Sequence, residues 1–204
     1  MMRSVFVIAL LIAANAQNPP AGPRGGGNRR FGPIQTMTLT TIAWPDGGLI
    51  PSKYTQAGPE ISPGLQWSGA PQGTVSFVLL FHDVDTVVNG SSDDILHWML
   101  WNIPATATSI APGRPDGFEW EDGTRQLSAS GSRYRGPGAA AAGPLHHYVM
   151  EIFALDTMLD IKVNAQGPQE PNPNVQTIRN SVMQAMVGHI RGKGAYVGLF
   201  HRTQ

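Results

Sequence analysis

The sequence predicts a mostly β protein, an antiparallel β-sandwich with a single helix near the C-terminus. Composition is the first observation: charged residues make up 14% of the chain, while glycine and proline number 24 and 17, which favours turns and strands over long surface helices. The second observation is that short apolar runs alternate with loops rich in proline and glycine, as in sandwich proteins.

Each element follows from a local pattern. The run at residues 34–44 is rich in Thr, Ile and Leu and stops at a Pro-Asp-Gly-Gly turn, which predicts a strand. Further strands are expected at 75–81, 97–103, 148–155 and 195–201. A helix is expected at 175–187, where apolar residues recur at helical spacing and a glycine follows as a stop.

The N-terminus has the layout of a secretory signal peptide over residues 1–16. A short positive start precedes an apolar run of about 11 residues, well short of the roughly 20 that span a bilayer. Ala14 and Ala16 then form a small-x-small cleavage site, so an exported protein, periplasmic or secreted, is expected. Residues 17–33 are expected to be a disordered leader rich in proline and glycine, and 34–204 one folded domain.

Charge and cysteine content exclude several classes of function. Lys plus Arg and Asp plus Glu number 14 each, so no global field attracts nucleic acid or an anionic membrane. The chain has no cysteine, which removes disulfides and thiol chemistry. No nucleic-acid partner and no integral membrane association are expected, and the oligomeric state cannot be predicted.

Three of the apolar runs carry polar side chains that a buried strand would not tolerate without a use for them. Asp83 follows the strand expected at 75–81, and His97 leads the next one. His146 and Tyr148 share a face at the start of a third, because side chains alternate along a strand. If these strands are neighbours, one carboxylate, two imidazoles and a phenol converge in a small polar pocket.

These segments resemble the phosphatidylethanolamine-binding protein family, including its bacterial members. The resemblance rests on Asp83-Val84-Asp85-Thr86-Val87, His97-Trp98, Gly136-Pro137, His146-His147-Tyr148 and the closing segment at 188–194, in the family's order over roughly 34–202. It implies the family's sandwich fold and an anion pocket lined by Asp83, His97, Gly136, Pro137, His146 and Tyr148.

The sequence departs from the family's pattern at the rim of that pocket. Val84 and Val87 replace the prolines of the first motif, and the run Gly138-Ala139-Ala140-Ala141-Ala142 replaces a proline pair. Ligand selectivity is expected to reside at this rim.

The chemistry of the set suits a phosphate or carboxylate, which needs charge-assisted donors. Two imidazoles, a tyrosine hydroxyl and backbone N–H groups of the loop would supply them. Asp83 is expected to accept from one imidazole, fixing its tautomer and favouring its charged form. Arg133 and Arg135 could reach the anion from the neighbouring loop, although loop arginines are commonly solvated. Asp85 is expected to cap a turn.

A metal site is the rival use of the same residue types. The candidate ligands beyond His97 are His82, His146, His147, His189 and His201. No His-x-x-x-His spacing occurs, and His146 and His147 should point to opposite faces of a strand, so neither a metal nor another cofactor is expected.

The function favoured by the sequence is the binding of a small anionic ligand, a phosphate ester or a phospholipid headgroup, by an exported protein. The first alternative is an isomerase, cyclase or hydrolase that acts on a small anion, with His146 as general base and His97 and Asp83 as its companions. The second alternative is an interaction protein of the protease- or kinase-inhibitor type, which the resemblance allows.

Overall fold

The computed structural model of this protein describes residues 34–163 and 174–203. The predicted signal peptide at 1–16 and the predicted leader at 17–33 lie outside the described residues. Within the described residues no helix is both long enough and apolar enough to cross a membrane.

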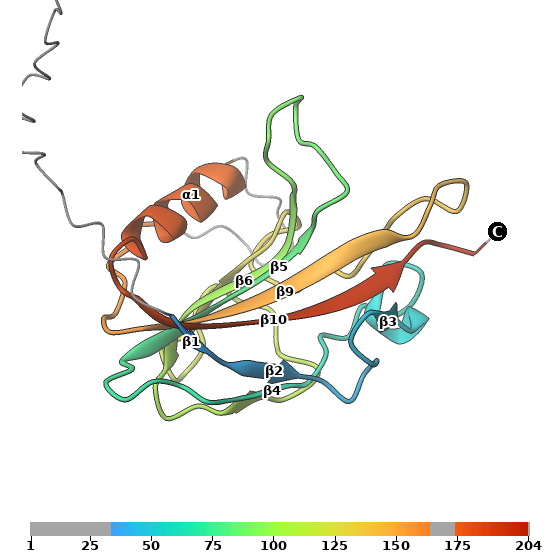
Figure 1. Ribbon diagram of the computed structural model, residues 1–204. Coiled ribbons are helices and arrows are strands. Elements are labelled where there is room, and N and C mark those ends of the chain that lie inside the picture. Colours follow the sequence, from blue (N-terminus) through green and yellow to red (C-terminus); the bar gives the residue numbers. More distant parts are fainter. Residues whose placement is uncertain (1–33, 164–173, 204) are drawn as a thin grey trace, which may run out of the picture. The chain divides into compact units, whose positions relative to one another are not determined.

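The described chain forms two β-sheets, with one α-helix on the outer face of the larger sheet (Figure 1). The larger sheet has the order β1 (Gln35–Thr36), β10 (Ile190–Phe200), β9 (His146–Leu155), β5 (Ser76–Asp83), β6 (Ile95–Pro104) and β8 (Arg125–Leu127), and β3 (Gly48–Leu49) also pairs with β10. The smaller sheet contains β2 (Thr38–Thr40), β4 (Leu65–Ser68) and β7 (Ser109–Ile110). The short 3₁₀ helix η1 (Ser52–Tyr54) and the helix α1 (Val175–Ala185) complete the fold.

The predicted β-sandwich with a C-terminal helix is confirmed, with one refinement of strand direction. The long ladders of β5, β6, β9 and β10 are antiparallel, but β1 and β3 pair with β10 in parallel. The prediction of one continuous strand at 34–44 is wrong, because this segment is divided between the two sheets. The chain first pairs with β10 as β1, then joins the smaller sheet as β2, and pairs with β10 again as β3. Both short edge strands therefore run in the direction of β10.

The larger sheet is buried on both faces because successive residues of its strands serve two separate cores. On β5, Phe77, Leu79 and Phe81 pack toward the smaller sheet. Val78 and Leu80 belong instead to the core beneath α1. That helix contributes its buried residues Ile178 and Val182, and Met186 follows directly after it, as the helical spacing of the sequence predicts.

Polar contacts around Asp94 fasten α1 to the sheet beyond its apolar face. Arg179 of the helix forms an ion pair with the Asp94 carboxylate, and Gln176 Nε2 donates to the Asp94 carbonyl oxygen at 2.8 Å. His82 Nδ1 of β5 lies 2.6 Å from Asp94 Oδ2 on the same face. Burial opposes protonation of His82, but hydrogen bonds to Asp94 and Glu151 outweigh burial and raise its pKa. The start of α1 is thereby held beside the start of β6.

Candidate functional site

A polar cavity of about 130 Å³ lies where β5 ends and the antiparallel strands β6 and β9 begin. It has room for several waters or one small anionic group, and it is smaller than a typical pocket for a whole organic ligand. The residues that line it are Gln56, Asp83, Thr86, Ile95, His97, Arg135, Gly138, Ala139, His146 and Tyr148.

Strand pairing brings the four predicted polar side chains together in this cavity. Asp83 pairs directly with Tyr148 across β5 and β9, and His146 shares the face of Tyr148. His97 arrives through a β-bulge: Phe81 pairs with Trp98 and the next residue of β5 pairs with Leu96, which leaves His97 without a partner opposite it. The alternation within each strand could be predicted from the sequence, whereas the bulge could not.

The Asp83 carboxylate is buried and orients His146. Asp83 is only 2% exposed, and its Oδ2 lies 2.8 Å from His146 Nδ1. The other oxygen, Oδ1, accepts from the backbone N–H of Asp85 at 3.1 Å. The imidazole that Asp83 contacts is therefore that of His146.

Tyr148 uses its hydroxyl oxygen to hold the loop that covers the cavity. The oxygen accepts from the backbone N–H groups of Gly138 at 3.3 Å and Ala139 at 3.1 Å. Burial raises the pKa of Tyr148 well above its usual value, and the nearby Asp83 charge acts in the same direction, so the phenol keeps its proton. These two loop N–H groups therefore serve Tyr148 and not, as the sequence suggested, a ligand.

His97 is a neutral imidazole, whereas the sequence suggested that both imidazoles would donate to an anion. Its residue is 2% exposed, and burial lowers its pKa to about 4 despite the favourable contribution of the nearby carbonyl groups and of Asp83. Its Nδ1 lies 3.0 Å from the carbonyl oxygen of Arg135, which can only accept, so Nδ1 carries the proton. The remaining ring nitrogen, Nε2, is an acceptor.

Gly136 and Pro137 support the cavity wall from behind and are not among the residues that line it. The Gly136 N–H donates to Glu60 Oε1 at 3.1 Å, and its carbonyl accepts from Gln56 Nε2 at 2.8 Å. A Cβ at Gly136 would lie 2.7 Å from Thr55 Cα, so this close approach requires glycine. The lining passes instead to the next residues of the loop, Gly138 and Ala139.

Arg135 is the one permanently cationic side chain among the lining residues. Its Nη1 donates to Ser130 Oγ at 2.5 Å, which fixes the guanidinium. Its Nε is buried and has no hydrogen-bond partner among the described residues. Arg133 has a different environment, because its Nη1 lies 4.0 Å from Glu60 Oε2 and its Nε donates to the Ser130 carbonyl.

Lining residues that the sequence did not single out come from distant segments. Gln56 follows η1, and its cavity position depends on its contacts with the loop at 136–137. The Thr86 hydroxyl donates to the Asp83 carbonyl at 2.8 Å and accepts from the Ile95 N–H at 3.1 Å, so it closes the turn after β5. Single glutamine and threonine residues carry no local signal of such contacts.

Asp85 braces the outside of the site: its role is structural, as expected, but its side chain contacts His147 where a turn cap was expected. Since β5 ends at Asp83, strand parity no longer applies, and Asp85 Oδ2 accepts from the His147 backbone N–H at 2.5 Å. The same oxygen lies 2.9 Å from His147 Nδ1, and these hydrogen bonds with His147 lower the pKa of Asp85. His146 and His147 point to opposite faces of β9, as predicted.

The histidines do not assemble into a metal centre. Within residues 34–163 and 174–203, no three side chains of His, Asp or Glu gather as metal ligands. His82 pairs with Asp94 under α1, and His189 lies 2.8 Å from Asp156 on the surface.

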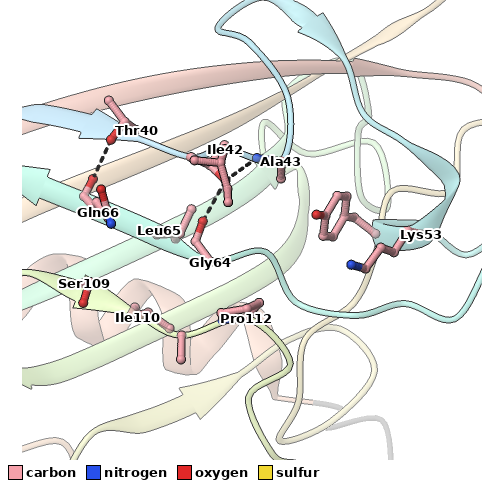
Figure 2. A pocket seen from close by; sticks show the side chains of 13 residues that line it. Thr40, Ile42, Ala43, Lys53, Gly64, Leu65, Gln66, Ser109, Ile110 and Pro112 are labelled. Carbon is pink, nitrogen blue, oxygen red and sulfur yellow. Dashed lines mark hydrogen bonds between the residues drawn. The ribbon is translucent and has the colours of Figure 1, made fainter.

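A second cavity, of about 380 Å³, lies at the end of the smaller sheet (Figure 2). Apolar side chains such as Ile42, Leu65 and Ile110 line it, together with Lys53. Figure 2 shows hydrogen bonds that join the two strands beside it: Thr40 Oγ1 donates to the Gln66 carbonyl, and Thr41 Oγ1 donates to the Gly64 carbonyl. It is larger than the polar cavity but has no histidine or carboxylate in its lining, so the convergent chemistry lies at the polar cavity.

Comparison with known proteins gives consistent results. A family model described as phosphatidylethanolamine-binding protein matches residues 40–201. The UPF0098 protein of Methanothermobacter thermautotrophicus is 35% identical over 168 residues, which cover 81% of this chain and 99% of that protein. The crystal structure of a phosphatidylethanolamine-binding protein homologue from Chlamydia trachomatis has a TM-score of 0.64 at 25% identity, covering 82% of this chain and 99% of that one. That of Escherichia coli YbcL has a TM-score of 0.64 at 20% identity, with the same coverage.

Proposed function

This chain belongs to the phosphatidylethanolamine-binding protein family, and from that premise we propose that it binds a small anionic ligand, a phosphate ester or a phospholipid headgroup, in the polar cavity. The observation that carries the proposal is the cavity itself, where Arg135 and the Asp83–His146 pair meet in about 130 Å³. Family membership supports ligand binding in general, and the side chains support the chemical class.

The donors available in the cavity suggest which form of the anion fits. Arg135 offers the guanidinium N–H groups that do not bind Ser130, whereas the Tyr148 hydroxyl hydrogen-bonds to Asp83. His97 offers only the lone pair of Nε2, because its Nδ1 proton points to the Arg135 carbonyl. A phosphate monoester monoanion matches both demands, since it has anionic oxygens for Arg135 and a P–OH for His97.

The same geometry favours catalysis as a second candidate. His146 Nδ1 at 2.8 Å from the buried Asp83 carboxylate is the arrangement that orients a general base. The lining hydroxyl of Thr86 is committed to the backbone, so a reaction here would use His146 on the substrate or on water. An isomerase, cyclase or hydrolase acting on a small anion fits this arrangement.

Binding can be tested with methyl phosphate at pH 5.5, where the monoanion predominates because its second pKa is near 6. We expect calorimetry to show that His146→Gln weakens affinity by about tenfold or more. Asp83 holds His146 Nδ1, so the other ring nitrogen is the one that can bind the anion, and a hydrogen bond to a charged group is worth about 1.5–3 kcal/mol. His147→Gln is the matched control, since that side chain lies on the opposite face of β9. Equal losses in both variants, or no binding to the unmodified protein, would contradict the proposal.

The assay also separates a binding protein from an enzyme. The unmodified protein is incubated with a panel of phosphate esters and anhydrides, and products are followed by ³¹P nuclear magnetic resonance. Turnover that His146→Gln loses and His147→Gln keeps would replace the pure binding function with the catalytic one.

Export is part of the same proposal, and it is supported by the apolar run that precedes Ala14-Asn15-Ala16. Intact-mass measurement of protein recovered outside the cytoplasm is expected to show a chain that starts at Gln17. A recovered chain that retains residues 1–16 would rule out this cleavage.

A further inference from the structure

We propose that the polar cavity adjoins a second subsite on the other side of Arg135, and that the ligand is an organic phosphate ester whose apolar group occupies this subsite. The inference rests on the proposed anion binding and extends it from the phosphate group to the rest of the ligand.

The second subsite is a cavity of about 450 Å³ beside the polar one. Its apolar lining consists of Val87, Val88, Ile95, Leu96, Ala129 and Val175. Ile95 and Arg135 line both cavities, so these two side chains form a shared wall. The volume is within the usual range for organic ligands, whereas the polar cavity accepts little more than the anionic group.

Two polar residues, Arg135 and Gln176, line this subsite beside the apolar side chains. Arg135 Nε, a donor, and Gln176 Oε1, an acceptor, are both buried without a hydrogen-bond partner among the described residues. Both residues line the 450 Å³ cavity of the second subsite. Leaving such atoms unpaired in a folded protein is costly. Since neither atom is exposed to solvent, the contacts that this wall offers a ligand are the other guanidinium N–H groups of Arg135 and the apolar side chains around it.

The walls of the subsite are held in place without a ligand. Gln176 Nε2 donates to the Asp94 carbonyl at 2.8 Å, and the Val88 N–H donates to the Asp93 carbonyl at 2.8 Å. The loop between β5 and β6 therefore faces the start of α1, on the same side of the larger sheet (Figure 1). Val87 of this loop is 73% exposed, which leaves an apolar side chain uncovered at the rim of the subsite.

Monoalkyl phosphates from methyl to hexyl test the subsite directly by calorimetry. We expect affinity for the unmodified protein to rise by about fourfold for each methylene that becomes buried. Val87→Ala is expected to lower the ratio of hexyl phosphate to methyl phosphate affinity by roughly threefold, because apolar contact area is lost. Val187→Ala is the matched control: Val187 is also exposed, at 65%, and lies beyond the C-terminal end of α1.

The possible outcomes separate this inference from the proposed function. If methyl phosphate binds but chain length has no effect, the subsite is wrong and the anion site stands. If neither methyl nor hexyl phosphate binds, both are wrong. A chain-length effect that Val87→Ala and Val187→Ala change equally would also overturn the subsite.

Once chain-length dependence is found, a vesicle-binding experiment identifies whether the ester is a membrane lipid or a free molecule. Retention of the protein on phosphatidylcholine vesicles that contain phosphatidic acid, with competition by hexyl phosphate, indicates a bilayer lipid. Absence of retention indicates a free ester. Either result supports the subsite, because the same apolar group and phosphate are recognised.

Discussion

Lowering the pH from 7 to 4 is expected to remove about 3 kcal/mol of unfolding free energy that depends on His97. The pKa of this buried imidazole is lowered from 6.5 to about 4 in the folded protein, chiefly by burial. Between these two values the unfolded chain binds a proton at His97 and the folded protein does not, so stability falls as the pH falls. Above pH 6.5 the contribution is fully present.

Urea unfolding at pH 4, 5, 6 and 7 measures this dependence. The His97→Gln variant is expected to have a shallower decline than the unmodified protein, because glutamine can donate to the Arg135 carbonyl but cannot titrate. His147→Gln serves as the control, since His147 is exposed on the opposite face of β9. Identical declines in the unmodified protein and His97→Gln would mean that His97 is accessible to protons in the folded state.

The period-two alternation of strands is what made part of the site predictable. Asp83, His146 and Tyr148 meet because their strands are neighbours and each side chain has the expected parity. The resemblance supplied the order of the strands' motifs, which a single sequence does not reveal by periodicity. Asp85 shows where parity fails, because the strand ends two residues earlier and a turn redirects the side chain.

His97 shows what the sequence could not reveal. Its cavity position depends on a bulge between β5 and β6, which is a property of the pairing of two strands. Its neutral state depends on burial, and the acceptor for its Nδ1 proton is a carbonyl 38 residues further along the chain. Both facts arise from tertiary contacts, so the sequence could not reveal that His97 is neutral and presents an acceptor to the cavity.

Arg135 is the reverse case: the sequence suggests a solvated residue, and the fold places it at the cavity. From the sequence it is a loop arginine, and such residues are commonly solvated. In the fold its carbonyl accepts from His97, its Nη1 donates to Ser130, and its side chain forms a wall between two cavities. One residue thus links the position of the loop to the charge of the cavity, which makes it the sharpest test of anion binding.

Replacing Arg135 with glutamine is expected to weaken binding of methyl phosphate monoanion by about 10- to 100-fold, the range for loss of a hydrogen bond to a charged group. The backbone contact with His97 is preserved, so the imidazole should keep its tautomer. The affinity of Arg135→Lys is expected to lie between those of the unmodified protein and Arg135→Gln, because lysine keeps the charge but lacks the planar guanidinium. The loss should persist at high salt, since a partly buried pair is weakly screened.

Arg133→Gln is the matched control for this measurement. Arg133 is two residues away on the same loop, but it lies near Glu60 and is not among the residues that line the polar cavity. Calorimetry at pH 5.5, with thermal unfolding of each variant to verify folding, should show near-normal affinity for Arg133→Gln. If the two glutamine variants bind methyl phosphate equally well, the anion is held by something other than the Arg135 guanidinium, and the charge assignment of the cavity is wrong.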